Sequence, residues 1–177
     1  MGQIFEGGGD LMVPFAEVKE VAQIAKKQIE GKETKAFEKS GIDVNDIDCI
    51  ISAASVPPQL YPTLACTMQA MLGIKNTIPA FDLTAACSGL IYALQVARAN
   101  ILSGLYKRIL VVASDTTTKF LDWKDRGSCC LFGDGASATI VEAADDGEDD
   151  IKVVNLYADG DYKEIISLNV ETSVCPL

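Results

Sequence analysis

The chain has 177 residues, of which 49% are hydrophobic and 7% aromatic, and its formal net charge at pH 7 is −10. This length predicts one domain with a largely aliphatic core. The acidic balance argues against nucleic acid and an acidic membrane surface as partners, because both require clustered lysine and arginine. No stretch has the length and apolarity of a transmembrane helix, and the first ten residues lack the basic start of a secretory signal.

The first third of the chain predicts two helical stretches and one strand. Residues 1–13 have no clear pattern, and the glycine triplet 7–9 is interpreted as a flexible lead-in because no phosphate-cradling helix follows it. Apolar residues recur at helical spacing from Phe15 to Ile29. Glu33 to Ser40 continues in helical style, and Gly41 is the expected C-terminal cap. The run from Ile47 to Ala54 indicates a buried strand.

The middle of the chain alternates helix and strand. Pro62 at a first helical turn and Gly73 past the last turn bracket a helix. Ala80 to Leu83 is expected to be a strand, followed by a helix from Ser88 to Ser103. This helix is apolar on nearly every side, which is typical of helices in the centre of a protein. Arg108 to Ala113 indicates a strand buried on both faces of its sheet.

The last part of the chain predicts further strands. A turn at Gly133-Asp134-Gly135 precedes a strand from Ala136 to Ala143. The acidic residues between 145 and 150 are interpreted as a solvated turn, because they lack the ligand spacing of a calcium loop. Strands are expected over Ile151 to Tyr157 and Glu164 to Leu168. The alternation of strands and helices predicts an α/β layered fold.

Cys87 is the most informative residue of the sequence. It lies between the strand at Ala80 to Leu83 and the apolar helix, with only small neighbours around it. A nucleophile would stand at such a strand-to-helix turn, where free N–H groups and the helix dipole favour a thiolate. The alternative is a small buried hydrophobe without chemistry, which is the commoner state of a lone cysteine beside alanine and leucine.

The six cysteines do not form a metal or disulfide pattern. The sequence contains no histidine and no Cys-x-x-Cys pair, so no metal site is expected. Reduced thiols in a cytoplasmic protein are the simplest interpretation. The lack of histidine also limits catalysis, because a cysteine nucleophile normally needs a base. The cysteines are Cys49, Cys66, Cys87, Cys129, Cys130 and Cys175.

Three segments together resemble the β-ketoacyl-acyl carrier protein synthase III family. They are Phe81-Asp82-Leu83-Thr84-Ala85-Ala86-Cys87-Ser88-Gly89, Asp125-Arg126-Gly127-Ser128 and Leu131-Phe132-Gly133-Asp134-Gly135-Ala136. The resemblance extends from about Glu33 to Leu168, and it implies an α/β, thiolase-like layered fold, an αβα sheet sandwich. Sister families such as thiolases and chalcone synthases surround their cysteine with other residues.

The resemblance implies roles for individual residues. Cys87 would be the acylated nucleophile, with its backbone N–H as one oxyanion-hole donor. Arg126 would hold the coenzyme A adenine, and Phe132 would lie beside the nucleophile and its acyl pocket. For Gly133 and Gly135 the structural interpretation is favoured, a tight turn close beneath the active site where a Cβ would clash.

Departures from the family pattern concern what the sequence lacks. Family members are about twice as long and have two similar halves, and the second half supplies a His and an Asn for decarboxylation. The early family segment with a coenzyme A-contacting Trp has no counterpart, and Trp123 is not that residue. We therefore interpret residues 1–31 as an unassigned lead-in and helix, and 32–177 as an N-terminal half, from a truncated gene or a partial reading frame.

The resulting hypothesis is a condensing enzyme that initiates fatty acid synthesis. It would join acyl-CoA, with acetyl-CoA expected, to malonyl-acyl carrier protein through a Cys87 acyl-enzyme. No cofactor is expected besides acyl-CoA as substrate, and the expected partners are acyl carrier protein and a second copy in a homodimer. The alternatives are a polyketide-type condensing synthase and a non-catalytic half-domain that only folds or dimerises.

Overall fold

The computed structural model describes residues 32–57, 59, 61–144, 149–163 and 166–167. Its centre is a four-stranded sheet in the order β2-β1-β3-β4. The strands are β1 (Cys49–Ala53), β2 (Ala80–Leu83), β3 (Arg108–Thr116) and β4 (Asp134–Glu142). Strand β1 pairs in parallel with β2 and β3, and β4 is antiparallel to β3. The carboxyl ends of β1, β2 and β3 therefore lie at the same end of the sheet as the start of β4, and this end is called the carboxyl edge of the sheet.

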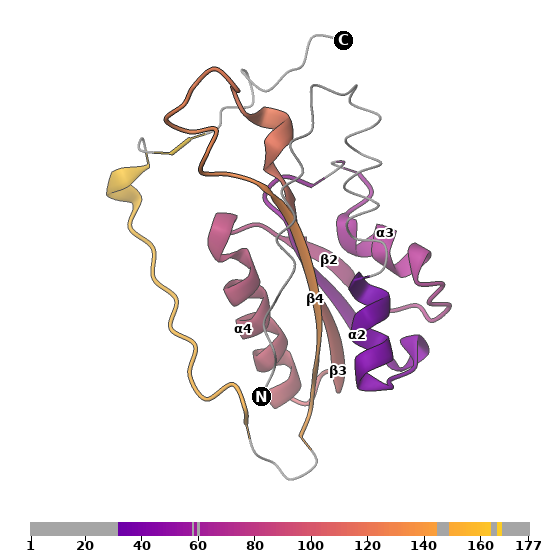
Figure 1. Cartoon of the computed structure of the whole chain (residues 1–177). Coiled ribbons are helices and arrows are strands. Elements are labelled where there is room, and N and C mark those ends of the chain that lie inside the picture. Colours follow the sequence, from indigo (N-terminus) through magenta and orange to yellow (C-terminus); the bar gives the residue numbers. More distant parts are fainter. Residues whose placement is uncertain (1–31, 58, 60, 145–148, 164–165, 168–177) are drawn as a thin grey trace.

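Helices cover both faces of the sheet (Figure 1). Helix α4 (Gly89–Leu102) lies on one face, and α2 (Lys32–Ser40) and α3 (Leu64–Met71) lie on the other. Alternate side chains of β1 point to the two faces, so Ile51 packs with α4 and Ile50 packs on the opposite side. Short 3₁₀ helices are η1 (Val44–Asp46), η2 (Ala86–Ser88), η3 (Thr117–Phe120) and η4 (Gly160–Tyr162).

Most predicted elements are present with small changes at their ends. Strand β3 is longer than expected, and four successive residues from Ile109 to Val112 are almost completely buried, which confirms burial on both faces. Helix α3 begins at Leu64, because Thr63 is its N-cap and accepts a hydrogen bond from the Cys66 N–H at 3.2 Å. Gly41 follows α2 with a φ of +70°, and its N–H donates to the Phe37 carbonyl at 2.8 Å.

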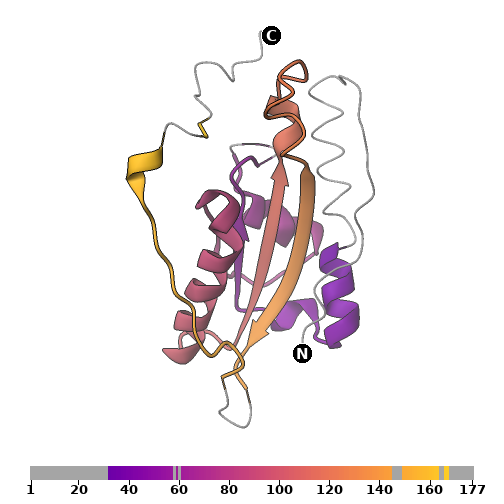
Figure 2. The ribbon, with the colours of Figure 1, turned by 60° about the vertical axis from the view of Figure 1, so that its left-hand side comes forward.

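The expectation of a strand from Ile151 to Tyr157 is wrong. This segment has no strand partner among the described residues and runs alongside α4 (Figures 1 and 2). Arg98 of α4 holds its start through an ion pair with Asp149 and a 2.9 Å hydrogen bond from Nε to the Ile151 carbonyl. Sequence periodicity predicts extended backbone, whereas a strand also needs a neighbour. Of the last expected strand, only Ile166 and Ser167 are described, and neither is in a strand.

Helix α4 is less buried than its apolar sequence predicts. The buried residues of α4 are the small ones, Gly89, Ala93 and Ala97. They form the side that faces the sheet, and their small size allows close approach. On its other sides Ile91 is 46% exposed and Leu102 is 61% exposed. The predicted helix from Phe15 to Ile29 lies outside the described residues. No helix in the described part of the chain has the length and apolarity needed to cross a membrane.

Candidate active site

Cys87 lies in a sharp turn between a strand and a helix. Strand β2 ends at Leu83, η2 contains Cys87, and α4 begins two residues later at Gly89. The preceding Ala86 has a φ of +46°, in a region that residues with a side chain rarely adopt. The Cys87 side chain is exposed, with small residues on both sides of it. The expected strand-to-helix turn is therefore present, and the thiol is accessible at its surface.

Close packing holds this turn against the sheet. A Cβ added to Gly89 would lie 3.3 Å from the Ala53 Cβ, which is tighter than ordinary contact. The start of α4 thus rests directly on the end of β1. On the strand side of the turn, the Thr84 hydroxyl donates to the Ala54 carbonyl at 3.2 Å, and the Ala54 N–H donates to the Leu83 carbonyl at 3.4 Å.

Arg126 and Phe132 lie in the connection from η3 to β4. The Asp125 carboxylate organises this connection, because it accepts hydrogen bonds from the Ser128 hydroxyl at 2.6 Å and the Gly127 N–H at 2.9 Å. These two hydrogen bonds, the one from Ser128 first, hold the pKa of Asp125 below its ordinary value. Arg126 is exposed within the turn, and Phe132 is half-buried just before β4.

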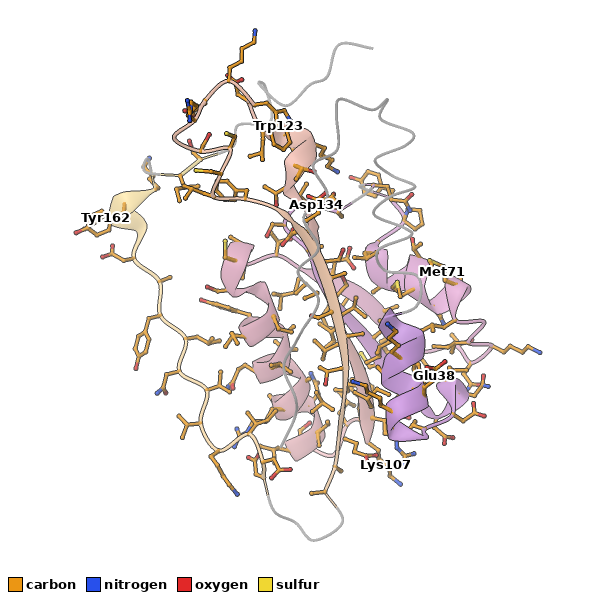
Figure 3. All side chains as sticks on the ribbon, in the orientation of Figure 1. Glu38, Met71, Lys107, Trp123, Asp134 and Tyr162 are labelled. Carbon is orange, nitrogen blue, oxygen red and sulfur yellow. The ribbon has the colours of Figure 1, made fainter. Side chains whose placement is uncertain are left out.

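The three residues predicted from the sequence occupy the same end of the sheet. In β3 and β4, Thr116 is opposite Asp134, so the connection that carries Arg126 and Phe132 leaves and re-enters the sheet at one edge. Figure 3 shows Trp123 and Asp134 at this end and Lys107 at the opposite end. Cys87 follows the carboxyl end of β2 at the same edge.

The interpretation of Gly133 and Gly135 as residues of a crowded turn is wrong. A Cβ on either glycine would meet no atom of the described residues within 4 Å, and neither has a positive φ. Gly135 already lies in β4, opposite Asp115. Strand β4 begins at Asp134, so from that residue onward the motif is extended backbone paired with β3.

Two carboxylates at this edge have structural roles that the sequence analysis missed. Asp115 Oδ1 accepts the N–H groups of Ser55 at 2.7 Å and Val56 at 2.8 Å. Asp82 accepts the N–H groups of Leu64 at 2.8 Å and Ala65 at 2.9 Å, and so caps α3 from a neighbouring strand. The sequence signal for both is an aspartate near the end of an apolar strand. No group of three or more metal-ligating side chains occurs in the described ranges.

The chain is similar to known proteins in sequence and in fold. Residues 81–160 match the family model described as 3-oxoacyl-[acyl-carrier-protein (ACP)] synthase III. The beta-ketoacyl-[acyl-carrier-protein] synthase III 1 of Vibrio vulnificus is 48% identical over 135 residues, which are 76% of this chain and 42% of that protein. The corresponding synthase III of Chlamydia caviae is 44% identical over 142 residues, which are 80% of this chain and 42% of that protein.

Solved structures show the same fold. The 3-oxoacyl-[acyl-carrier-protein] synthase III of Aquifex aeolicus superposes with a TM-score of 0.61 at 39% identity, over 64% of this chain and 36% of that one. A priming β-ketosynthase from a polyketide biosynthetic pathway superposes with a TM-score of 0.60 at 35% identity, over 64% of this chain and 34% of that one.

The fold is that of a thiolase-like α/β protein, as the sequence predicts. Within that class, the chain is similar to β-ketoacyl-acyl carrier protein synthase III proteins, and the extent of the match fits an N-terminal half. The chain spans 42% of the length of the first two relatives named above.

Proposed function

We propose that this chain carries the acyl-accepting site of a β-ketoacyl-acyl carrier protein synthase III. The observation that carries the proposal is the exposed Cys87 thiol in the turn between β2 and α4. The family match covers this turn, and both relatives named above are called synthase III. The protein would act as an acyltransferase in the initiation of fatty acid synthesis.

The first half-reaction moves an acyl group to Cys87. The Cys87 thiolate attacks the thioester carbonyl of a short acyl-CoA, with acetyl-CoA as the proposed primer. A carbon–sulfur bond to Cys87 forms, the bond to coenzyme A breaks, and coenzyme A leaves as a thiolate. The Cys87 backbone N–H donates to the developing oxyanion. In this proposal Arg126 contacts the adenine of coenzyme A, and Phe132 borders the acyl pocket.

The second half-reaction joins two carbon chains. Malonyl-acyl carrier protein loses carbon dioxide, and the resulting carbanion attacks the Cys87 thioester. The carbon–sulfur bond to Cys87 then breaks, which releases the β-ketoacyl product and restores the thiolate. Because the sequence has no histidine, it lacks the histidine that the resemblance assigns to decarboxylation. We therefore expect the isolated 177-residue chain to accept an acyl group without completing condensation.

Several features of the whole protein belong to the same proposal. No cofactor besides the acyl-CoA substrate is required, and acyl carrier protein is the macromolecular partner. We place the protein in the cytoplasm, which agrees with the free state of the five described cysteines. The exposed apolar side chains on and near α4 support assembly as a homodimer.

Mass spectrometry of the intact chain after incubation with acetyl-CoA tests the first half-reaction. We expect a mass increase of one acetyl group, mapped to Cys87 and absent from Cys87→Ser. Cys66→Ser is the matched control, because Cys66 is also exposed but lies on α3. Acetylation that survives in Cys87→Ser, or that is lost equally in Cys66→Ser, would contradict the assignment.

A polyketide-type priming synthase is the second candidate. The structural similarity to a priming β-ketosynthase at 35% identity favours it. The two functions differ in the acyl group and the acceptor that they select. Competition between acetyl-CoA and longer or branched acyl-CoA thioesters for Cys87 distinguishes them: preferential acetylation supports the fatty acid assignment. If no thioester acylates Cys87, the non-catalytic half-domain is the better interpretation.

A further inference from the structure

The segment that follows β1 lies between the Cys87 turn and η3. On one side, Ala53 packs against Gly89, and Ala54 exchanges hydrogen bonds with Thr84 and Leu83. The next three residues, Ser55–Val56–Pro57, contact the end of β3 and η3 instead. This segment is therefore a continuous physical link between the nucleophile turn and the other side of the candidate active site.

Side chains from β3 and η3 hold that link in place. Asp115 accepts the N–H groups of Ser55 and Val56, and the Thr116 hydroxyl donates to the Val56 carbonyl at 3.1 Å. Lys119 completes the set, because its Nζ donates to the Pro57 carbonyl at 2.8 Å.

The surroundings of Lys119 restrict its side chain and favour its contact with the Pro57 carbonyl. The ammonium lies 5.0 Å from the centre of the Phe120 ring, within the range of a cation–π interaction. Burial lowers the pKa of Lys119, and the charge of Asp134 opposes that change. A surface lysine would remain hydrated, whereas this one is half-buried and engaged with backbone.

Helix η3 also contacts the end of the connection that carries Arg126 and Phe132. The Thr118 N–H and hydroxyl donate to the Asp134 carboxylate at 2.9 and 2.7 Å. Asp134 begins β4, two residues after Phe132. Lys119 and Thr118 are adjacent in η3. Lys119 contacts the segment after β1 that supports the Cys87 turn, whereas Thr118 contacts Asp134 at the end of the connection that carries Arg126 and Phe132.

We infer that Lys119 is a positioning residue that fixes the Cys87 turn relative to the connection 121–133. Its functional meaning rests on the proposed function, whereas the geometric claim does not. Without the contact from Lys119 to Pro57, the link after β1 keeps its ties to β3 but loses its tie to η3. The separation between the two sides of the site should then vary more widely.

Energy transfer from the single tryptophan measures this separation directly. Trp123 is the only tryptophan of the chain and lies in the connection, so it serves as the donor. A dansyl acceptor attached to Cys87 in a background with the other cysteines replaced by serine reports on the turn. Time-resolved transfer in the full chain gives the distribution of distances, and urea unfolding checks that each variant is folded.

We expect Lys119→Met to widen the Trp123–Cys87 distance distribution and Lys119→Arg to restore it. Lys124→Met is the matched control, because Lys124 is exposed in the same connection. If Lys119→Met does not fold, Lys119→Gln replaces it; its side chain is one atom shorter and should also widen the distribution. A folded Lys119→Met or Lys119→Gln chain with the distribution of the parent protein would overturn the inference.

A separate arm measures acetylation of Cys87 by acetyl-CoA in the parent chain. Because energy transfer requires no substrate, failure of acetylation would count against the proposed function alone. An unchanged distance distribution would count against the positioning role alone.

Discussion

At the scale of single residues, the conformation of Ala86 is the most unusual feature of the candidate active site. Its φ of +46° places a Cβ where steric contact with the backbone is unfavourable. This conformation costs an L residue roughly 1–2 kcal/mol, and glycine avoids the cost. The strain falls on the residue directly before Cys87, which is where a sharp turn must present the thiol.

We expect Ala86→Gly to leave the free energy of unfolding unchanged or raise it by up to about 1 kcal/mol. Ala86→Val should lower it by more than about 1 kcal/mol, because a β-branched residue fits this region poorly. Urea unfolding of the two variants measures the difference. Equal stability of Ala86→Val and the parent chain would show that the turn relaxes.

The buried thiol of Cys49 makes the free energy of unfolding depend on pH in the alkaline range. Burial, with a smaller effect of the nearby Asp48 charge, raises the pKa of its thiol from 9.0 to about 11. The folded chain therefore binds this proton more tightly than the unfolded chain. The contribution of this proton to stability is complete below about pH 9 and is lost as the pH rises towards 11.

We expect the free energy of unfolding to fall across this pH window, and to fall less in Cys49→Ala. The alanine variant should be less stable than the parent near pH 7, because a buried sulfur is removed. Urea unfolding at several pH values compares the two slopes. Parallel slopes would mean that other groups cause the alkaline loss.

At the scale of secondary structure elements, Asp82 connects β2 to the start of α3. Its two oxygens accept the Leu64 and Ala65 N–H groups, which have no partner within the helix. The same strand leads to the Cys87 turn, so this contact fixes α3 relative to the candidate active site.

We expect Asp82→Ala to lower the free energy of unfolding by about 2 kcal/mol. Asp43→Ala is the control, because Asp43 caps the exposed η1 through the Asn45 N–H at 2.8 Å and should cost less. Thermal unfolding followed by circular dichroism compares them. A larger loss in Asp43→Ala would contradict the importance assigned to the contact between β2 and α3.

The sequence predicts the paired strands better than the unpaired segment. The continuous apolar run in β3 predicts a strand that is buried on both faces of the sheet, and β3 is buried in this way. Ile151 to Tyr157 also favours extended backbone, but only the tertiary structure decides whether it pairs. Likewise, motif and resemblance make Cys87 a candidate, whereas the contacts of Asp115 and Lys119 join residues about sixty positions apart. No local pattern encodes such contacts.

At the scale of the whole molecule, exposed apolar side chains determine how copies associate. Leu102 and Leu105 are 61% and 62% exposed at the end of α4, and Val153 is 72% exposed in the neighbouring extended segment. The net charge of −10 opposes contact between copies, and salt screens that repulsion. Apolar surface of this kind favours self-association.

We expect the chain to form a dimer or a larger species at low micromolar concentration, and more of it as salt increases. Leu105→Glu should shift the population towards monomer, whereas Lys107→Gln, which lowers the net charge equally near the same end, should not. Light scattering coupled to gel filtration measures the mass of each species. A monodisperse monomer that unfolds cooperatively would show that the chain covers its own core.

The antiparallel pairing of β3 and β4 has a consequence for how this scaffold evolves. Because Thr116 is opposite Asp134, both ends of the intervening 117–133 segment are fixed by the sheet. Insertions or deletions in the exposed part of that segment leave the strand register unchanged. Lineages that inherit the same sheet can therefore diversify the exposed residues between η3 and β4 as a module, while η3 and the frame that supports Cys87 are retained.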